Sequence, residues 1–367
     1  MRHFGNILFL VVILANALCT LLLLLVAYSP HIAPTVHPVE SCMGLTFPIF
    51  LVLNGCFLLF WLVVQKYKAA LLPLAGFLLC TAQIRLYIPI NFRTDALPEA
   101  SFKLLSYNIM GFNGATKQAD GTNPILTYLQ KSGADILCLQ EYITIEDKRY
   151  LTQHDVEQAL KAYPYHRILS VGHNKGANKM ACYSKFPILS TRTLSYPSDY
   201  NGSVLYELKI GNDTVTLINN HLESNKLTLE DTAVYTEMLK DPEKEKVKSG
   251  LRLLVRKLAE ASAIRAVQAD SIASHIARRK HPALIVCGDF NDTPISYTHR
   301  VIARGLDDAF AQSGRGLGIS YNQNKFYFRI DNILTSKELR SYNCMVDRSI
   351  RESDHYPIAC YLSLQKK

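Results

Sequence analysis

Residues 284–292 read Leu284-Ile285-Val286-Cys287-Gly288-Asp289-Phe290-Asn291-Asp292. The apolar run predicts a buried strand, and the glycine with the acidic and amide residues behind it predicts the turn that ends that strand. Sheets of this kind bind ligands at the ends of their strands, where polar side chains converge. The stretch therefore predicts both a sheet and a site at one of its ends.

Five further stretches between residue 102 and the C-terminus also place polar residues next to an apolar, strand-like run. Their polar residues, next to strand-like runs, are Asn108, Glu141, His221, Asp331, and the pair Asp354 and His355. With Asp289 and Asn291 they would form an oxygen-rich pocket with two imidazoles, which suits Mg²⁺ or Mn²⁺. Such a cation would relieve the repulsion between carboxylates and neutralise charge on a phosphate.

Each of these residues also has a simpler interpretation. An asparagine at a strand end is usually a turn residue, and residues 289–292 alone could form an Asx turn. A single histidine such as His221 is more often structural than catalytic. The functional interpretation depends on all of these residues occurring together and in this order.

The chain from residue 102 onward is rich in short apolar runs. They predict strands at 102–108, 135–140, 165–171, 179–184, 204–210, 214–220, 283–288, 329–334 and 357–362. Helical periodicity is found at 124–131, 156–162 and 251–279, and the charged stretch 240–248 is predicted to be a solvated loop. Many strands with inserted helices, but no strict β–α–β alternation, favour a two-sheet α/β sandwich.

The first 94 residues are much more apolar than the rest of the chain. Apolar stretches at about 7–28, 45–64 and 69–90 predict three transmembrane helices, since about 20 apolar residues span a bilayer. A signal peptide or a buried helix could explain one such stretch but not three in succession. Residues 1–94 are therefore predicted to be a membrane anchor, with a linker at 95–101.

The few charges of this anchor predict its orientation. Its strong bases are Arg2, Lys66, Lys68, Arg85 and Arg93. The loop between the first two predicted helices has no lysine or arginine, whereas the second loop has two lysines. The positive-inside rule places the N-terminus and the second loop in the cytoplasm. An odd number of crossings then sends the C-terminal domain to the outer side of the membrane.

Charge and cysteine content exclude some classes of function. Residues 95–367 carry 35 bases and 30 acids, a balance too even to indicate a nucleic-acid partner by itself. The nine cysteines show no zinc-type spacing. Several lie in apolar runs, so we expect buried free thiols and no disulfide framework.

The polar motifs together resemble the endonuclease/exonuclease/phosphatase superfamily, which has the deoxyribonuclease I-like fold. The matching segments occur in the family's order: Ser106-Tyr107-Asn108, Leu139-Gln140-Glu141, Asn220-His221-Leu222, Gly288-Asp289-Phe290-Asn291, Arg329-Ile330-Asp331 and Ser353-Asp354-His355. Residues 265–268 and 292–297 are similar to bacterial members. The resemblance implies a four-layer α/β/β/α sandwich over residues 102–367. Together with the predicted transmembrane helices and their orientation, the similarity to bacterial members predicts a bacterial inner-membrane protein with a periplasmic catalytic domain.

The resemblance also implies a role for each residue in metal-dependent hydrolysis of phosphoester bonds, with water as the nucleophile. Glu141, with Asn108 and Asp354, would bind one or two Mg²⁺ or Mn²⁺ ions. Asp289 would position or deprotonate the water, and Asn291 would orient Asp289 or stabilise the transition state. His355, oriented by Asp331, would contact the phosphate, and His221 would donate to the phosphate or the leaving oxygen.

Three functions remain open at this level. The first is a nuclease, for which Lys325-Phe326-Tyr327-Phe328 would be a contact loop, although an ordinary strand with a core aromatic explains this segment better. The second is a phosphodiesterase or phosphatase that acts on lipid headgroups or small phosphoesters. The third is a membrane-tethered binding protein without activity, against which the complete set of polar residues argues.

Overall fold

The stretch at 284–292 forms a central strand, β8 (Leu284–Asp289), of a six-stranded sheet. The computed structural model describes residues 2–173, 178–225, 244–323 and 327–365. The strands of this sheet are, in spatial order, β5 (Ile188–Leu194), β6 (Gly202–Ile210), β7 (Asp213–His221), β8, β10 (Asp331–Thr335) and β9 (Asp307–Asp308). Only β7 and β8 run parallel, so the sheet is mixed.

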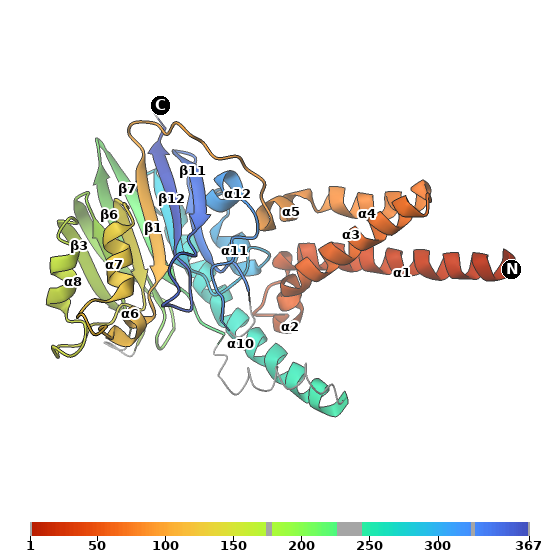
Figure 1. The fold of residues 1–367 in the computed structure, drawn as a ribbon, viewed down its shortest axis with the longest axis horizontal. Coiled ribbons are helices and arrows are strands. Elements are labelled where there is room, and N and C mark those ends of the chain that lie inside the picture. The colour runs from red at the N-terminus through yellow and green to blue at the C-terminus, as the bar shows by residue number, and fades with distance from the viewer. Residues whose placement is uncertain (1, 174–177, 226–243, 324–326, 366–367) are drawn as a thin grey trace.

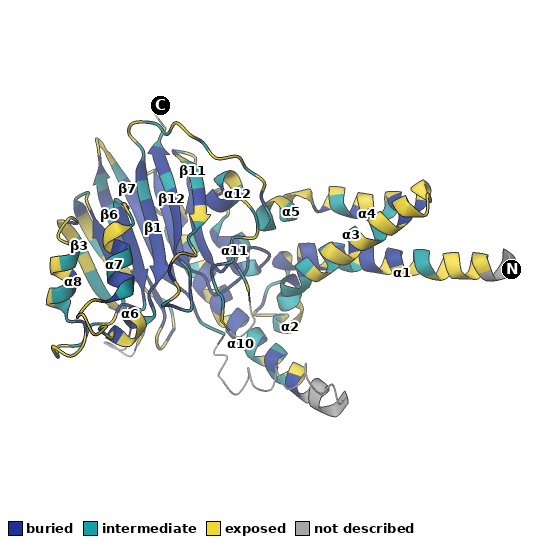
Figure 2. Ribbon diagram, viewed as in Figure 1, coloured by how far each residue is buried: buried dark blue, intermediate teal, exposed yellow. Residues whose placement is uncertain are grey.

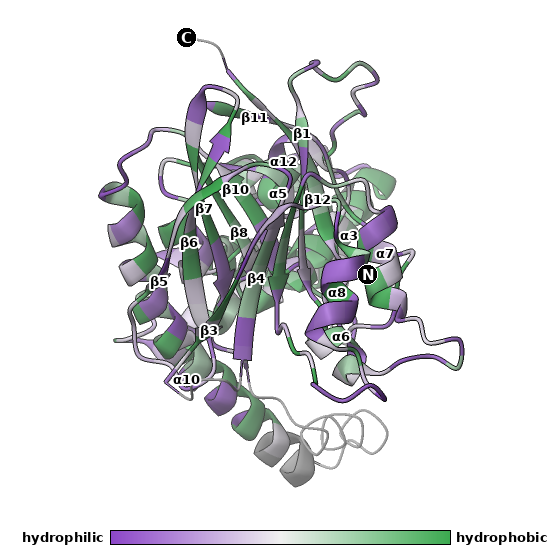
Figure 3. Cartoon of the chain, turned by 90° about the vertical axis from the view of Figure 1, so that its left-hand side faces the viewer, coloured by the Kyte–Doolittle hydropathy of each residue, from purple (hydrophilic) through white to green (hydrophobic). Residues whose placement is uncertain are grey.

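A second mixed sheet of six strands faces the first (Figures 1 and 3). Its spatial order is β11 (Leu339–Val346), β12 (Ile358–Leu364), β1 (Phe102–Asn108), β2 (Ile136–Gln140), β4 (Asn178–Ser184) and β3 (Tyr165–Val171). Here β1 and β2 are the parallel pair. The predicted two-sheet α/β sandwich is therefore confirmed.

Helices cover the outer faces of both sheets and complete four layers. The elements are α6 (Met110–Ala115), α7 (Pro124–Lys131), α8 (Gln153–Ala159), α10 (Lys244–Ala277) and α11 (Tyr297–Ile302). The short helix α12 (Ala309–Ser313) instead packs Ala309 and Phe310 into the core between the sheets. One core cluster lies between the sheets, and Cys138, Cys182 and Cys287 are part of it. Two further clusters join α7 and α8 to one sheet and α10 and α11 to the other. Figure 2 shows central strands such as β1 and β12 almost entirely buried.

All nine cysteines are free thiols, and the five beyond residue 102 are buried. Burial in an apolar core raises the pKa of the Cys138 thiol, which keeps it protonated and unreactive.

Three strands were not predicted from the sequence. Strands β5, β9 and β11 lie at sheet edges, and most residues of β5 and β11 are exposed or half-buried. Their polar content, such as Ser-Thr-Arg-Thr at 190–193, gives the composition of a loop. The short helices α6, α11 and α12 also lack a periodic signal, because each has only one or two turns.

The prediction of a loop at 240–248 is wrong for its second half. Helix α10 begins at Lys244 rather than at residue 251, and residues 240–243 lie outside the described part of the chain. A helix cannot continue back through Pro242, but the lysines and glutamate that follow it are good helix formers. Their charge is compatible with a helix that projects from the domain (Figure 1).

Apolar helices form the N-terminal part, and most of their surface is exposed (Figure 2). They are α1 (Arg2–Tyr28), η1 (Ser29–His31), α2 (Pro38–Ser41), η2 (Cys42–Thr46), α3 (Phe47–Val63), α4 (Tyr67–Leu79) and α5 (Thr81–Tyr87). Two stretches of this region, Gly5–His31 and Pro38–Val63, are long and apolar enough to span a membrane. They correspond to the first two predicted transmembrane helices.

The third predicted helix, at about 69–90, is not a single helix. It consists of α4 and α5, which are bent by 64° at Cys80 and could form a third span only as a bent pair. The hydroxyl of Thr81 donates to the carbonyls of Leu78 and Phe77, at 2.8 and 3.2 Å. Such side-chain bonds to the preceding turn bend helices.

A buried chain of polar side chains holds α1 against α3. Trp61 Nε1 donates to Asn16 Oδ1 at 2.8 Å, and Thr20 Oγ1 donates to Asn54 Oδ1 at 2.8 Å. Asn16 Nδ2 also donates to Thr20 Oγ1, so the two pairs form one network. Polar side chains between apolar helices stabilise their association because no water is present to replace these bonds.

The apolar helices also pack directly on the sandwich. Arg300 Nε donates to Pro30 O at 2.7 Å, and Arg329 Nη2 donates to Leu86 O at 2.6 Å. Ile295 is buried in a cluster with residues of α1, α3 and the α4–α5 break. Gly44 lies so close to the backbone carbonyl of Ile295 that a side chain there would overlap it. The two parts of the chain therefore form one packed body.

Replacing Gly288 with alanine is expected to destabilise the fold by about 3 kcal/mol or more. Gly288 has a φ of +122°, and a Cβ there would lie 2.0 Å from the carbonyl oxygen of Asn220 on the neighbouring strand. Thermal unfolding would measure the change. Gly211→Ala is the matched control, because Gly211 also has a positive φ, +58°, but open space around it. Equal effects of the two substitutions would contradict the steric explanation.

Candidate functional site

Side-chain alternation along the strands brings the predicted residues to one end of the inter-sheet core. In β8, Ile285 and Cys287 face the other sheet, so Asp289, two residues further on, faces the same way. The same period places Asn108 after Leu104 in β1, and His221 after Leu217 in β7. Strand register aligns His221 with Asp289, and Asp289 with Asp331. Local sequence pattern and strand pairing thus build the site together.

Glu141 follows the last residue of β2 and turns back towards this cluster. Its φ of +53° is rare for a residue with a side chain and reverses the direction that an extended strand would give. Asn108 Nδ2 donates to Glu141 Oε1 at 3.0 Å, and His221 Nε2 lies 3.5 Å from the same oxygen. The Glu141 side chain is 35% exposed, so its carboxylate remains open to a ligand.

Asp289 is a fully buried carboxylate at the centre of the site. Its Oδ1 accepts from Asn291 N at 2.8 Å, and its Oδ2 accepts from Asn108 Nδ2 and Asn291 Nδ2, each at 3.2 Å. Burial raises the pKa of Asp289 to about 6, although His355 and His221 oppose the shift. A carboxylate with this pKa can accept a proton near neutral pH.

Asn291 holds this arrangement through its own backbone. Its φ is +51°, and its Nδ2 also donates to Leu222 O at 3.0 Å. In this strained turn, the backbone N–H of Asn291 donates to one oxygen of Asp289 and the side-chain amide of Asn291 donates to the other.

His355 and Asp331 form a buried pair. His355 Nδ1 lies 2.8 Å from Asp331 Oδ2, and His355 Nε2 lies 3.6 Å from Asp289 Oδ2. Burial would lower the pKa of His355, but Asp331 and Asp289 outweigh it and raise that pKa well above its usual value. The ring of Tyr321 packs edge-on against His355, and Ser320 Oγ accepts from Asp331 N at 3.1 Å.

His221 is oriented by Asn178, at the start of β4. The two side chains meet at 3.1 Å between Asn178 Nδ2 and His221 Nδ1. With the amide nitrogen as donor, the proton of a neutral His221 is on Nε2, which faces Glu141 and Asp289. Asn178 was not predicted, because it lies 43 residues from its partner and carries no motif.

Asp354 belongs to the same wall as Glu141. Burial raises the pKa of Asp354, and the negative charge of Glu141 adds to the shift. Ser353 Oγ donates to Asn108 O at 2.7 Å and so ties the Ser353-Asp354-His355 segment to the end of β1. All eight predicted site residues therefore lie in one region of the fold.

This region has the chemistry of a cation site. Asp289, Asp331 and His355 are buried and close enough together that the three could hold a metal ion. Asp331 Oδ1 is buried and has no hydrogen-bond partner among the described residues. In a second set, Glu141 and Asp354 offer partly exposed carboxylates to the cavity, and the buried Asn108 lies beside Glu141.

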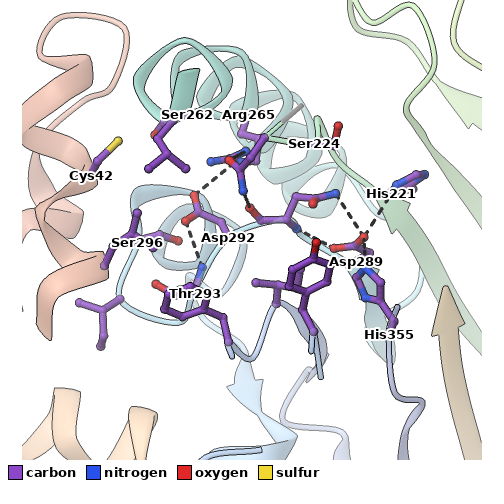
Figure 4. A pocket seen from close by; sticks show the side chains of 18 of the residues that line it. Cys42, His221, Ser224, Ser262, Arg265, Asp289, Asp292, Thr293, Ser296 and His355 are labelled. Atoms are coloured by element: carbon purple, nitrogen blue, oxygen red, sulfur yellow. Dashed lines mark hydrogen bonds and ion pairs between the residues drawn. The ribbon is translucent and has the colours of Figure 1, made fainter. Parts of the chain in front are cut away.

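A cavity of about 440 Å³ opens beside these residues (Figure 4). Glu141, His221, Asp289, Asp354 and His355 line one part of it. Ser262 and Arg265 of α10 line another part, and Ser41, Cys42 and Leu45 of the N-terminal helices complete the wall. No local sequence pattern indicated that the apolar N-terminal region contributes to this cavity.

Arg265 is another residue of the cavity wall that had no predicted role. Its Nη1 donates to Glu223 O and Asn225 Oδ1, both at 2.9 Å, and its Nε lies 3.4 Å from Asp292 Oδ2. Its side chain is only 4% exposed. Arg265 therefore braces the loops around the site rather than presenting a free positive charge.

The possible contact loop at 325–328 is only partly described. Lys325 and Phe326 lie outside the described residues, Tyr327 is exposed, and Phe328 lines the cavity. Residue 328 forms an isolated bridge with Tyr321 rather than belonging to a strand, so the expected ordinary strand is not found at that position.

Comparison with known families gives two matches that divide the chain. Residues 105–355 match the sequence profile of the endonuclease/exonuclease/phosphatase family. Residues 6–87 match a domain of unknown function (DUF8431). No curated protein sequence matches the chain.

Several solved structures are similar to this one at low sequence identity. The human Nocturnin catalytic domain with bound sulfate anion has 17% identity and a TM-score of 0.49, over 75% of this chain and 96% of that one. An endonuclease/exonuclease/phosphatase from Beutenbergia cavernae DSM 12333 has 14% identity and a TM-score of 0.49, over 72% of each chain. Humanized D. rerio TDP2 has 15% identity and a TM-score of 0.46, over 72% of this chain and 100% of that one.

Proposed function

Because this chain belongs to the endonuclease/exonuclease/phosphatase family and is accordingly a phosphoester hydrolase, we propose that it works with a divalent cation, with water as the nucleophile, from a membrane-anchored position. The observation that carries the proposal is the convergence of Glu141, Asp289 and two histidines on one cavity, with Asn108 bonded to both carboxylates from behind.

Glu141, Asn108 and Asp354 are the proposed ligands of Mg²⁺ or Mn²⁺. Carboxylate and amide oxygens suit these hard cations, and Glu141 is the most exposed of the central carboxylates. When bound, the cation would supply positive charge to a phosphate oxygen. We assign His355 to proton handling instead, because its Nδ1 is already paired with Asp331 and its raised pKa favours the protonated form, which cannot bind a metal.

Asp289 is the proposed proton acceptor for the attacking water. It is buried, its two oxygens are oriented by Asn291, and its pKa of about 6 leaves it mostly ionised at neutral pH while it can still take up a proton. Asn291 acts as its positioning residue.

The two histidines are the proposed donors to the phosphate and the leaving oxygen. Protonated His355 would stabilise negative charge that develops on the phosphate, and Asp331 would hold its orientation. His221, with Nε2 facing the cavity and Nδ1 held by Asn178, is placed to donate a proton.

The proposed membrane arrangement follows from the distribution of charge along the helices. The C-terminal end of α1 and the α2–η2 segment lie against the sandwich, whereas the start of α1 and the α3–α4 connection lie at the far end (Figure 1). Arg2, Lys66 and Lys68 belong to that far end, and no lysine or arginine occurs in residues 29–46. The positive-inside rule then favours three crossings, with the bent α4–α5 pair as the third and the catalytic domain on the outer side.

The test of the proposed function is hydrolysis by the full-length protein with Mg²⁺, Mn²⁺ or EDTA. Suitable substrates are bis(p-nitrophenyl) phosphate, p-nitrophenyl phosphate, single-stranded DNA, duplex DNA, RNA, a phosphoinositide and sphingomyelin. We expect turnover that EDTA abolishes and Mg²⁺ or Mn²⁺ restores. Turnover that survives EDTA, or none with any substrate, would refute the proposal.

The pH profile of kcat/KM should be bell-shaped. Below about pH 6 activity should fall, because protonated Asp289 can no longer accept a proton. At high pH activity should fall as His355 loses its proton. Asp331→Asn removes the carboxylate that raises the pKa of His355, so the alkaline limb should move to lower pH. The acid limb should also move to lower pH, because the negative charge of Asp331 contributes to the raised pKa of Asp289. An unchanged alkaline limb in this variant would contradict the role of the pair.

A further inference from the structure

The cavity extends well beyond the residues that carry the proposed chemistry. Its catalytic end is lined by Glu141, Asp289 and His355, whereas its other end is lined by apolar side chains. These are Leu45, Leu254, Leu258 and Ile295. Phe328 and Ile330 also line the cavity, and bridges through Tyr321 bring Phe328 close to His355. Hydrolysis of a phosphoester alone does not require an apolar region of this kind.

The wall of this apolar end is partly built by a candidate membrane span. Ser41, Cys42 and Leu45 belong to the stretch Pro38–Val63, one of the two helical stretches able to cross a membrane. Figure 4 shows Cys42 on the N-terminal helices, facing the cavity across from Ser262 of α10. The cavity thus runs from the catalytic residues to the place where the membrane surface would lie.

The contact between this segment and the sandwich is close. Ser41 Oγ lies 3.4 Å from Ser262 Oγ, and Gly44 packs directly on the Ile295 carbonyl. A Cβ at Gly44 would come within 1.9 Å of that carbonyl oxygen, so the approach depends on glycine. The apolar end is therefore a built part of the cavity rather than a chance opening.

The charges around the cavity do not suit a polyanion. Among its described lining residues, Glu141, Asp289, Asp292 and Asp354 are acidic, and Arg265 is the one arginine or lysine. The guanidinium of Arg265 is already bonded to Glu223 O, Asn225 and Asp292. A nucleic acid is normally held by several free cations along its backbone, so a lipid fits this cavity better.

We propose that the substrate is a phosphoester of a membrane lipid. Its phosphate group would lie at the Glu141–Asp289–His355 end, and its apolar chain would lie between α10 and the Ser41–Leu45 segment. This inference rests on the proposed function. It gives the N-terminal helices a second role besides anchoring, because they complete the binding site of the substrate's apolar part.

The experiment uses the full-length protein in nanodiscs and compares two inhibitors that differ only in chain length. Ethyl phosphate and octyl phosphate, both below the micellar range, compete with hydrolysis of p-nitrophenyl phosphate or bis(p-nitrophenyl) phosphate. Empty nanodiscs give the correction for partitioning of octyl phosphate. We expect octyl phosphate to inhibit on the order of 100-fold more tightly, because its additional methylenes leave water.

Variants locate the effect within the cavity. Leu258→Asn and Leu45→Asn should each reduce the octyl preference about tenfold, and Leu258→Met should restore it. Leu251→Asn is the matched control on the same helix: Leu251 is 53% exposed, lies outside the cavity lining, and should leave both inhibition constants unchanged. Thermal unfolding of each variant shows whether the fold is retained.

The outcomes separate this inference from the proposed function. Equal inhibition by the two phosphates, or an octyl preference that Leu258→Asn does not change, overturns the lipid inference and leaves metal-dependent hydrolysis standing. More efficient hydrolysis of a single-stranded oligonucleotide than of phospholipids also overturns it. If neither p-nitrophenyl ester is hydrolysed with Mg²⁺ or Mn²⁺, the proposed function fails, and the inference fails with it.

Discussion

Asp289→Asn should lower kcat by about 10³-fold while the protein stays folded. Asparagine keeps the size of the side chain and one acceptor oxygen, but it cannot take up a proton. Asp289 is 1% exposed, and burial disfavours the charged form of its carboxylate. Because the substitution removes this buried carboxylate, the thermal stability of the protein should not fall substantially. Steady-state hydrolysis of a p-nitrophenyl ester with Mn²⁺ would measure the loss.

The matched control for this substitution is Asp307→Asn. Asp307 lies on the short edge strand β9, pairs with the exposed Lys337, and does not line the cavity. The Asp307→Asn substitution should leave kcat unchanged. If Asp289→Asn retained more than about a tenth of the wild-type kcat, another group would have to accept the proton, and the role given to Asp289 would be wrong.

Glu141→Ala should abolish measurable turnover by weakening metal binding by at least about 100-fold. Glu141 is the carboxylate that is both hydrogen-bonded to Asn108 and open to the cavity. Without it, the proposed ligand set keeps only one carboxylate, Asp354. Isothermal titration calorimetry with Mn²⁺ would measure the affinity independently of turnover.

This experiment also distinguishes the two possible metal positions. If Glu141→Ala bound Mn²⁺ with unchanged affinity, the ion would belong to the buried group of Asp289, Asp331 and His355 instead. Glu260→Ala is the control, because Glu260 lies on the exposed face of α10, outside the cavity lining, and its ion-pair partner within the described part of the chain is Arg256 at 3.7 Å. It should change neither Mn²⁺ affinity nor turnover.

Much of the fold followed from patterns that are local in the sequence. Nine strands, the two-sheet α/β sandwich and the burial of Cys138 and Cys287 could be predicted, because buried strands need continuous apolar runs. The four-layer arrangement was implied only by the resemblance to a known family. Edge strands such as β5 and β11 could not, because half of their residues face water and their composition is that of a loop.

The candidate site was also largely visible in the sequence, and the physical reason is the period of the strands. Asn108, His221 and Asp289 each follow an inward-facing apolar residue by two or four positions, so they had to face the same space. What the sequence did not indicate was which strands pair, and hence that His221 aligns with Asp289 and that Asp331 lies opposite it.

The sequence by itself thus determined a sandwich with an oxygen-rich end and an apolar N-terminal region long enough to cross a membrane. Only the tertiary structure decided that Asn178 orients His221 across 43 residues, and that Ser41 meets Ser262 across 221 residues. It also decided that the third apolar stretch breaks at Cys80. Periodicity and composition are properties of neighbouring residues, whereas the packing of the N-terminal helices on the catalytic cavity depends on contacts that leave no local pattern.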